Sequence, residues 1–333
     1  MGIITINSKI ALPIYKQIIY SIHDGIEKGK LKHGDMIPSV NQIANKFSLA
    51  RGSVFNAYNE LKATGIIDSI PGKGYFISGT QVKQQQNIFL LFSTFTPYKE
   101  ILYNSILKNL NSKCTVGIYF HHHNIKIFET LIREQANYYN KFIVMPEVHD
   151  KTLEILETLD ERKIFLLDTG LKEYGKKFPG VYQNFEKDIF NTLNNNKKLF
   201  NKYKRILLVF PVCNKSTGII SGFKRFVKKI PKEFSVINSI NTEEIKKKDV
   251  CIVIDDNDLV SLIKMSKANN WKMGKDIGVI SYNETALKSV MGDGITTITT
   301  DFEEMGKSIA QMILNGNRKS IENPFIMINR QSF

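Results

Sequence analysis

Residues 33–61 read HGDMIPSVNQIANKFSLARGSVFNAYNEL and decide the fold of the first part of the chain. Ser39, with Gln42 three residues later, has the spacing of a capping box and predicts a helix that ends near Phe47. After the three residues SLA, apolar positions at i, i+3, i+4 and i+7 predict a second helix over residues 51–64. Its buried face is formed by Val54, Ala57, Tyr58 and Leu61. Two helices joined by so short a turn form a helix-turn-helix, whose second helix can enter the major groove of DNA.

The exposed first turns of this second helix carry a polar edge that suits contact with DNA bases. The residues of that edge are Arg51, Gly52, Ser53, Phe55 and Asn56. Helix pairs of the same geometry also occur in purely structural folds, so the pair alone leaves two interpretations open, a DNA reader and a structural unit.

The segments on either side favour the DNA reader. Residues 13–29, PIYKQIIYSIHDGIEKG, predict a helix, because isoleucines recur at every fourth position of one face. Residues 66–78, IIDSIPGKGYFIS, predict two short strands joined by a glycine-rich turn. Gly72 lets the backbone of that turn approach a partner closely, and Lys73 can neutralise a phosphate. Three helices followed by a basic hairpin are typical of a winged DNA-binding domain.

The segments LPIYKQI, GKLKHGDMIPSVNQIA, ARGSVFNAYNEL and GIIDSIPGKGYFI resemble the winged helix-turn-helix of the GntR family of bacterial regulators, across residues 10–78. The resemblance implies that Ser39 caps a helix on the phosphate side. It implies that Arg51 is the leading arginine of the recognition helix and that Ser53 makes a polar contact. It also implies that Gly72 and Lys73 belong to a wing that reaches the minor groove.

Three positions depart from the family pattern. Ala50 stands where relatives have a Ser or Thr cap, which costs about 1 kcal/mol of helix stability. Asn41 and Phe55 occupy positions where arginine is common. Phe55 either meets a thymine methyl group or packs within the protein. The usual operator of the family is therefore not expected to apply unchanged.

From Asn87 onward, apolar strands alternate with amphipathic helices over residues 126–139, 217–229 and 258–270. The strands are predicted from the runs IFLLF, VGIYF, FIVMP, IFLLD, RILLVF, VCIVID and IGVISY. Runs this apolar are typical of parallel strands covered by helices on both faces, so we expect an α/β domain with a doubly wound parallel sheet. The predicted organisation is a DNA-binding domain over 1–78, a polar linker over 79–86, GTQVKQQQ, and an effector-binding and dimerisation domain over 87–333.

Three features of the second domain could bear chemistry. Asp255 follows a buried strand, where it either contacts a ligand or caps a helix. The loop of residues 93–96, STFT, offers hydroxyls beside an aromatic ring, which suits a sugar, although an ordinary loop has the same composition. Residues 121–123 are three histidines; consecutive strand residues point to opposite faces, so we expect a solvent-facing loop and no metal site.

The segments STGIISGFKRF, VCIVIDDNDLVSLIK and GITTITTDFEEMGKSIAQMIL resemble the sugar-sensing domain of LacI-type repressors, a two-lobed fold like that of periplasmic binding proteins. The resemblance extends over residues 87–333, and it implies effector contacts at Ser93, Thr94, Phe95, Asp168, Gln183, Asp255, Asn283 and Thr300. Ile219 stands where relatives carry a ligand-binding arginine. A GntR-type reader joined to a LacI-type sensor resembles the arabinose-repressor subfamily.

Composition excludes several other classes of protein. No run approaches the roughly 20 apolar residues of a membrane span, and the N-terminus lacks the features of a signal peptide. Cys114, Cys213 and Cys251 are odd in number and far apart, which suits a reducing compartment and predicts a cytoplasmic protein. The net charge of +14 favours a polyanionic partner but is spread along the chain. No nucleophile elbow, P-loop, dinucleotide fingerprint or zinc motif is present, so we expect no enzyme activity, cofactor or metal.

The sequence therefore predicts a homodimeric regulator that binds double-stranded operator DNA and represses carbohydrate-utilisation genes. By resemblance, its effector is a monosaccharide, a pentose or a deoxyhexose such as arabinose or fucose, and its binding releases the DNA. A GntR-type regulator or activator that responds to a nucleoside or another small polar metabolite has the same architecture. A fusion with an aminotransferase needs a longer second domain than residues 87–333 provide.

Overall fold

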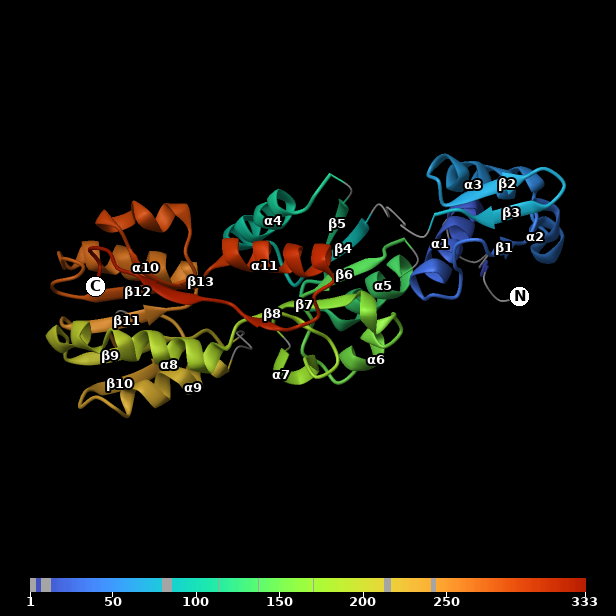
Figure 1. Ribbon diagram of the computed structural model, residues 1–333. Helices are drawn as coiled ribbons and strands as arrows, with labels where there is room; N and C mark the ends of the chain where they lie inside the picture. The colour runs from blue at the N-terminus through green and yellow to red at the C-terminus, as the bar shows by residue number, and fades with distance from the viewer. Residues whose placement is uncertain are drawn as a thin grey trace. The chain divides into compact units, whose positions relative to one another are not determined.

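The computed structural model of this 333-residue chain describes residues 4–6, 13–79, 86–112, 114–136, 138–169, 171–212, 217–240 and 244–333 (Figure 1). Most of the expected linker, residues 80–85, and Cys213 lie outside the described residues. The chain forms two compact units. One contains the residues up to Phe89 together with Ser112–Gly117 and Glu129–Lys141, and the other contains Leu90–Asn111, Ile118–Phe128 and Phe142–Phe333.

The N-terminal segment forms three helices and a small sheet, as its apolar spacing predicts. The helices are α1 (Ile14–Glu27), α2 (Val40–Phe47) and α3 (Arg51–Ala63), and the strands are β1 (Met36–Ile37), β2 (Ile67–Ile70) and β3 (Gly74–Ile77). The strands of this sheet have the order β1-β3-β2, and each neighbouring pair is antiparallel. The core under the helices includes Ile18, Val54 and Tyr58, all almost fully buried. Strand β1 precedes the capping box, in a stretch for which the sequence analysis predicts no strand.

The start of α2 confirms the predicted capping box. The Ser39 hydroxyl accepts a hydrogen bond from the Gln42 amide at 3.3 Å, and the Gln42 side-chain oxygen accepts one from the Ser39 amide at 2.7 Å. Ser48 ends the helix in the left-handed region, with φ of 52°. Ala50, before α3, makes no side-chain cap, so the second helix of the pair depends on packing for its N-terminal end.

Replacing Ser39 with alanine is expected to destabilise the N-terminal domain by about 1 kcal/mol, because an amide at the helix start loses its acceptor. Trp271, the single tryptophan, lies outside this domain, so hydrogen exchange of the buried α3 amides is the appropriate measurement. Asn41→Ala, at an exposed position of α2, is the matched control and should leave exchange nearly unchanged. Equal protection in the Ser39 variant and the wild type would contradict the assigned role.

After the N-terminal domain, the described chain forms two lobes, each built on a six-stranded sheet. The first lobe has the strand order β14-β8-β7-β6-β4-β5 and the second has β10-β9-β11-β12-β13-β15. The first sheet comprises β4 (Gln86–Phe92), β5 (Cys114–Phe120), β6 (Lys141–Val144), β7 (Ile164–Asp168), β8 (Gly180–Tyr182) and β14 (Ile321–Glu322). The second comprises β9 (Arg205–Val209), β10 (Glu233–Ile237), β11 (Asp249–Val253), β12 (Gly278–Tyr282), β13 (Thr296–Thr300) and β15 (Phe325–Ile328).

The parallel arrangement predicted from the apolar runs is confirmed for most of these ladders. Strands β14, β8, β7 and β6 are parallel, as are β10, β9, β11, β12 and β13. Among the ladders whose direction is described, that of the edge strand β15 differs, since it pairs with β13 in the antiparallel direction, with Thr300 opposite Phe325. After β13 the chain passes through α11 (Phe302–Asn315) and β14 in the first lobe and returns at the end of the sheet where β13 ends, so β15 runs back along β13 in the opposite direction.

Helices cover the sheets of both lobes. In the first lobe, α4 (Pro97–Asn109) and α11 (Phe302–Asn315) lie side by side, joined by a bond from the Ser105 hydroxyl to the Glu303 carbonyl at 2.6 Å (Figure 1). Gly306 allows this contact, because an added Cβ would lie 2.6 Å from the Ser105 Cβ. The lobe also contains α5 (Ile125–Gln135), α6 (Thr152–Leu156) and α7 (Leu171–Tyr174).

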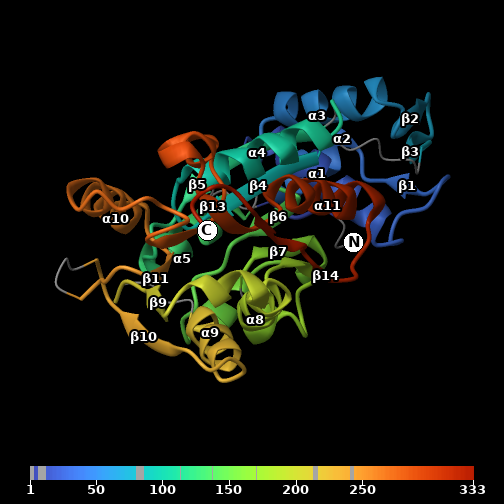
Figure 2. The same cartoon turned by 90° about the vertical axis from the view of Figure 1, so that its left-hand side faces the viewer.

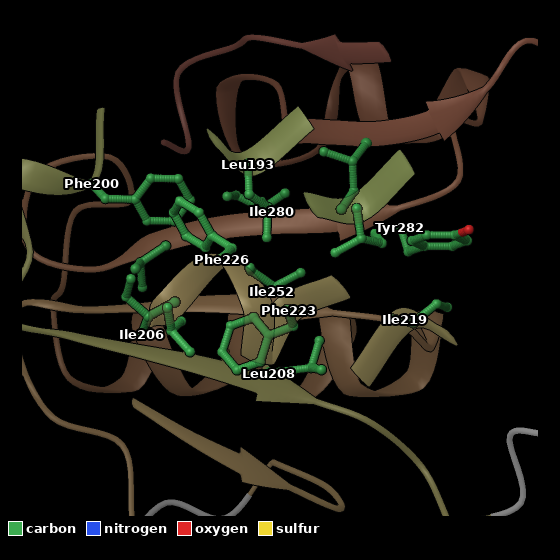
Figure 3. Close-up of a cluster of buried hydrophobic side chains, with 14 of the residues drawn as sticks. Leu193, Phe200, Ile206, Leu208, Ile219, Phe223, Phe226, Ile252, Ile280 and Tyr282 are labelled. Carbon is green, nitrogen blue, oxygen red and sulfur yellow. The ribbon is translucent and has the colours of Figure 1, made fainter. Parts of the chain in front are cut away.

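The second lobe has a core rich in phenylalanine. Helices α8 (Phe185–Asn195) and α9 (Gly218–Val227) pack together over its sheet (Figure 2). They contribute side chains to a buried cluster that includes Phe223, Phe226 and Ile219 (Figure 3). Tyr282 lies at the edge of this cluster with its hydroxyl pointing away from the phenylalanines. Helix α10 (Asp256–Ala268) contributes to a separate cluster with strand residues such as Val253.

The chain passes between the two lobes after β8, after β13 and between β14 and β15. Hydrogen bonds from Asn323 join these three passages. Its amide donates to the Tyr182 carbonyl at 2.8 Å, and its side-chain nitrogen donates to the Thr300 hydroxyl at 2.7 Å. Among the described residues, no helix is both long and apolar enough to cross a membrane.

Candidate functional site

The first turns of α3 present the polar edge that the sequence predicts. Arg51, Gly52 and Asn56 are exposed, Ser53 is half-buried, and Phe55 keeps 50% of its surface exposed rather than joining the core. The opposite side of the helix is occupied by Val54, Ala57, Tyr58 and Leu61, all buried. Because the buried face fixes the rotation of α3, the polar edge must point outward from the domain.

The turn between β2 and β3 is exposed and basic. Gly72 has φ of 76° and Gly74 has φ of 115°, conformations that favour glycine. Lys73 lies between them, exposed, with its amide donating to the Ile70 carbonyl at 3.0 Å. A tight turn with a single cation at its tip can approach a phosphate backbone without a steric barrier.

In the second unit, a polar cluster forms where strands of both lobes end. From the first lobe, the Lys99 ammonium group in the first turn of α4 donates to the Ser93 hydroxyl at 2.5 Å and to the Thr94 hydroxyl at 3.3 Å. Burial lowers the pKa of Lys99, and the nearby Asp168 carboxylate partly offsets this effect. Two of the expected effector residues therefore surround a lysine that the sequence analysis did not identify.

Asp168 and Gln183 connect this cluster to the second lobe. The Gln183 side-chain nitrogen donates to an Asp168 carboxylate oxygen, and the Gln183 side-chain oxygen accepts a bond from the Tyr282 hydroxyl at 3.4 Å. Burial raises the pKa of Asp168, while the bond from Gln183 and the charge of Lys99 act in the opposite direction. Asp168 also has φ of 69°, a left-handed conformation that few residues other than glycine, asparagine and aspartate adopt.

The second lobe contributes Asn283, directly after β12. Its φ is 60°, its amide donates to the Ile298 carbonyl at 2.9 Å, and its side-chain oxygen is buried without a hydrogen-bond partner among the described residues. Burial raises the pKa of the Tyr98 hydroxyl in the first lobe, and the neighbouring Thr96 and Asn283 side chains act in the opposite direction. Tyr98 and Asn283 therefore meet across the two lobes.

A second buried lysine orders the loop after β12. The Lys288 ammonium group donates to the carbonyls of Tyr282 and Asn283, at 2.9 Å each, and pairs with the Asp256 carboxylate at 2.7 Å. It thereby fixes the backbone that presents Asn283. Neither lysine was identified from the sequence, although a cation in the first turn of a helix opposes the helix dipole, and Lys99 could have been recognised on that ground.

Three expected effector residues have other surroundings. The Thr300 hydroxyl is buried, donates to the Pro324 carbonyl at 3.2 Å and accepts from Asn323, so its hydrogen bonds join the passages between the lobes. Asp255 caps α10 by accepting from the Asn257 amide at 2.8 Å, in agreement with the helix-cap alternative. Phe95 is 60% exposed and its ring lies 5.9 Å from that of Phe120, edge to face.

The expectation of a solvent-facing histidine loop is wrong for His121. Its ring is fully buried, 5.4 Å from the Phe128 ring, with Nε2 3.1 Å from the Met145 carbonyl oxygen. Burial lowers its pKa to about 4. His123 is exposed, and its Nδ1 lies 3.0 Å from the Glu147 carboxylate. Within the described ranges, no group of three His, Cys, Asp or Glu side chains has the arrangement of a metal site.

Comparisons with known proteins give separate results for the two parts of the chain. Residues 14–77 match the model of the bacterial regulatory proteins of the gntR family. Over 75 residues, the chain is 39% identical to the HTH-type transcriptional repressor YtrA of Bacillus subtilis (strain 168), covering 22% of this chain and 58% of that protein. Over 74 residues, it is 38% identical to the arabinose metabolism transcriptional repressor of Geobacillus stearothermophilus, covering 22% of this chain and 20% of that protein. The matches thus span less than two thirds of these relatives.

The solved structures match about three quarters of this chain. The dimeric Lac repressor with an 11-residue C-terminal deletion superposes with a TM-score of 0.61 at 15% identity, covering 74% of this chain and 98% of that one. A second structure is that of the periplasmic binding protein/LacI transcriptional regulator from Alkaliphilus metalliredigens QYMF, complexed with D-xylulofuranose. It superposes with a TM-score of 0.56 at 13% identity, covering 74% of this chain and 98% of that one. At these identities the likeness shows the fold. The chain therefore joins a gntR-type helix-turn-helix domain to a domain with the fold of LacI-type regulators.

Proposed function

We propose that this protein is a sequence-specific, DNA-binding transcription regulator that represses carbohydrate-utilisation genes and leaves its operator when a monosaccharide binds. One observation carries the proposal: a single chain contains both the exposed polar edge of α3 and a domain of two lobes. Polar side chains from the two lobes come together in that domain. The proposal assigns residues 1–78 to DNA, 79–86 to a linker and 87–333 to effector binding and dimerisation. It assigns no catalytic step and no cofactor, and it places the protein in the cytoplasm with its operator.

On the DNA side, the N-terminal half of α3 would lie in the major groove and the turn around Lys73 would follow the adjacent phosphates or minor groove. Arg51, Ser53 and Asn56 are the candidates for base contacts, and Phe55 is free to meet a thymine methyl group. A homodimer would place two such helices on an operator with inverted repeats, since the symmetry of the protein is mirrored by that of its site.

On the effector side, the sugar would contact both lobes and favour one arrangement of them. Its hydroxyls would meet Ser93, Thr94, Asp168, Gln183 and Asn283, the expected residues that lie in the polar cluster. A ligand shifts such an equilibrium only through its different affinity for the two arrangements. The proposed effectors are pentoses and deoxyhexoses such as arabinose or fucose.

A second candidate effector is a nucleoside or another small polar metabolite with a planar ring. The observation that favours it is Phe95, whose exposed ring follows the hydroxyls of Ser93 and Thr94 and could stack on a base. Thermal-shift measurements with pentoses, deoxyhexoses and nucleosides separate the two candidates, because a ligand of the native state raises the apparent stability.

Lys73→Ala is expected to weaken binding to all duplexes alike and to reduce the slope of log affinity against log salt by about one, because one phosphate contact is lost. Fluorescence anisotropy at several salt concentrations measures both quantities. Lys108→Ala removes the same charge from an exposed position of α4 and serves as the control. An unchanged slope in the Lys73 variant would remove the turn from the DNA-binding surface.

The DNA-binding part of the proposal is tested by selecting tight-binding duplexes from a random pool with the full-length protein. We expect an inverted repeat whose half-sites are separated by about one or more helical turns. Recovery of duplexes with no common sequence would contradict sequence-specific regulation.

A further inference from the structure

Lys99 occupies an unfavourable position for a cation. It lies in the first turn of α4, where the positive end of the helix dipole disfavours an ammonium group, and only 5% of its surface is exposed. Its hydrogen-bond partners, the Ser93 and Thr94 hydroxyls, are neutral. Among the described residues, no carboxylate lies within 4.0 Å of its nitrogen. Burying a charge in this way is costly, and such exceptions concentrate at functional sites.

In the described part of the chain, Asp168 is a buried carboxylate without a cationic ion-pair partner, as Lys99 is a buried cation without an anionic one. Its carboxylate is buried, its backbone is held at φ of 69°, and its side-chain partner is the neutral amide of Gln183. Lys99 and Asp168 each influence the ionisation of the other, yet no direct ion pair joins them in the described structure. The two charges are therefore close enough to interact and too far apart to satisfy each other.

The other lobe adds an unsatisfied acceptor beside them. The Asn283 side-chain oxygen is buried without a partner among the described residues, and Asn283 meets Tyr98, the residue directly before Lys99. The cluster thus has hydrogen-bonding capacity of both kinds: an ammonium group that donates, and carboxylate and amide oxygens that accept. Hydroxyl groups can satisfy both kinds, because each donates one hydrogen bond and accepts others.

We propose that Lys99 is an effector-binding residue and that Lys99 and Asp168 together hold neighbouring hydroxyl groups of an uncharged polyol, with Lys99 donating and Asp168 accepting. The inference rests on the proposed function and adds to it a selection by charge. The two charges of the site already balance. A phosphorylated or carboxylated sugar would bring a negative charge against Asp168, and an amino sugar would bring a positive charge against Lys99. The site therefore selects the free sugar over its charged derivatives.

The test is Lys99→Met in the full-length protein, with isothermal titration of L-arabinose, L-fucose, D-xylose and D-ribose, and of D-ribose 5-phosphate and L-arabinonate. The wild type is expected to bind at least one free sugar and to bind the charged compounds more weakly. Lys99→Met should bind that sugar about 10- to 150-fold more weakly, the loss of a hydrogen bond from a charged group. Lys108→Met, exposed on the same helix, should match the wild type.

The double variant Lys99→Met with Asp168→Asn guards against a folding defect, because it removes both buried charges together. It is expected to melt near the wild-type temperature and still to bind the sugar weakly. Sugar binding by either variant within about twofold of the wild type, tighter binding of a charged derivative, or no binding of any free sugar by the wild type would each overturn the inference. Operator affinity measured on the same preparations identifies a failure of the proposed function separately.

Discussion

Arg51→Ala is expected to weaken operator binding by about 1–3 kcal/mol, roughly 5- to 150-fold at fixed salt, and to relax the preference at one base pair. Arg51 is the first residue of α3, it is exposed, and it forms no hydrogen bond or ion pair within the described part of the chain. Its guanidinium group is therefore available for a bidentate contact with guanine, the commonest specific contact in the major groove. Anisotropy with the selected operator, and with single-base variants of it, measures the effect.

The matched control is Arg51→Lys, which keeps the charge and removes the planar fork of donors. If Arg51 contacts a guanine, the lysine variant should lose base preference while keeping most of its affinity for nonspecific DNA. If the lysine variant retains the full preference, the residue acts as a simple phosphate contact. Unchanged operator affinity in Arg51→Ala would remove α3 from the interface.

Asp168→Asn is expected to lower effector affinity by about 1.5–3 kcal/mol, roughly 10- to 150-fold, because a charged acceptor of the sugar hydroxyls is lost. The substitution is conservative for the fold, since Asn tolerates φ of 69° and its oxygen can still accept the bond from Gln183. Removing a buried carboxylate whose pKa is raised by burial should not reduce the free energy of unfolding. Operator affinity without effector should equal that of the wild type.

Asp150→Asn provides the control for this experiment, because Asp150 is an exposed residue of the same lobe outside the polar cluster. It should leave both the effector titration and the release of operator unchanged. A full effector response in Asp168→Asn would show that the cluster around Lys99 and Gln183 does not bind the effector.

Much of the fold follows from local patterns in the sequence. The capping box at Ser39 and the helical spacing of α3 determine the helix-turn-helix, and both depend on residues within one or two turns. Strands β4, β7, β9, β11 and β12 are continuous apolar runs because helices cover both faces of their sheets. The apolar-run pattern does not identify β10, because this edge strand has exposed residues. It does not identify β8 either, because a strand of three residues is too short to form such a run. It also fails for β15, whose antiparallel pairing is made to a distant strand.

The polar cluster was predictable only in part. Resemblance placed Asp168, Gln183 and Asn283 together, and the structure brings them to the meeting of the lobes. The position of Lys99 in the first turn of a helix was a signal in the sequence, but its burial near Asp168 involves distant segments and leaves no local pattern. Asp255 and Thr300 lie near strand ends, where the sequence analysis expects them. Their side chains form hydrogen bonds within the protein, and residue type alone does not predict such bonds.

One measurement tests most directly whether sugar capture controls DNA binding. Full-length protein on its selected operator would be titrated with L-arabinose, L-fucose, D-xylose and D-ribose while anisotropy reports the bound fraction. We expect one of these sugars to reduce operator affinity, and Asp168→Asn to require a much higher concentration of the same sugar. Operator affinity that stays constant across the whole panel, in a preparation that binds one of the sugars, would contradict the account.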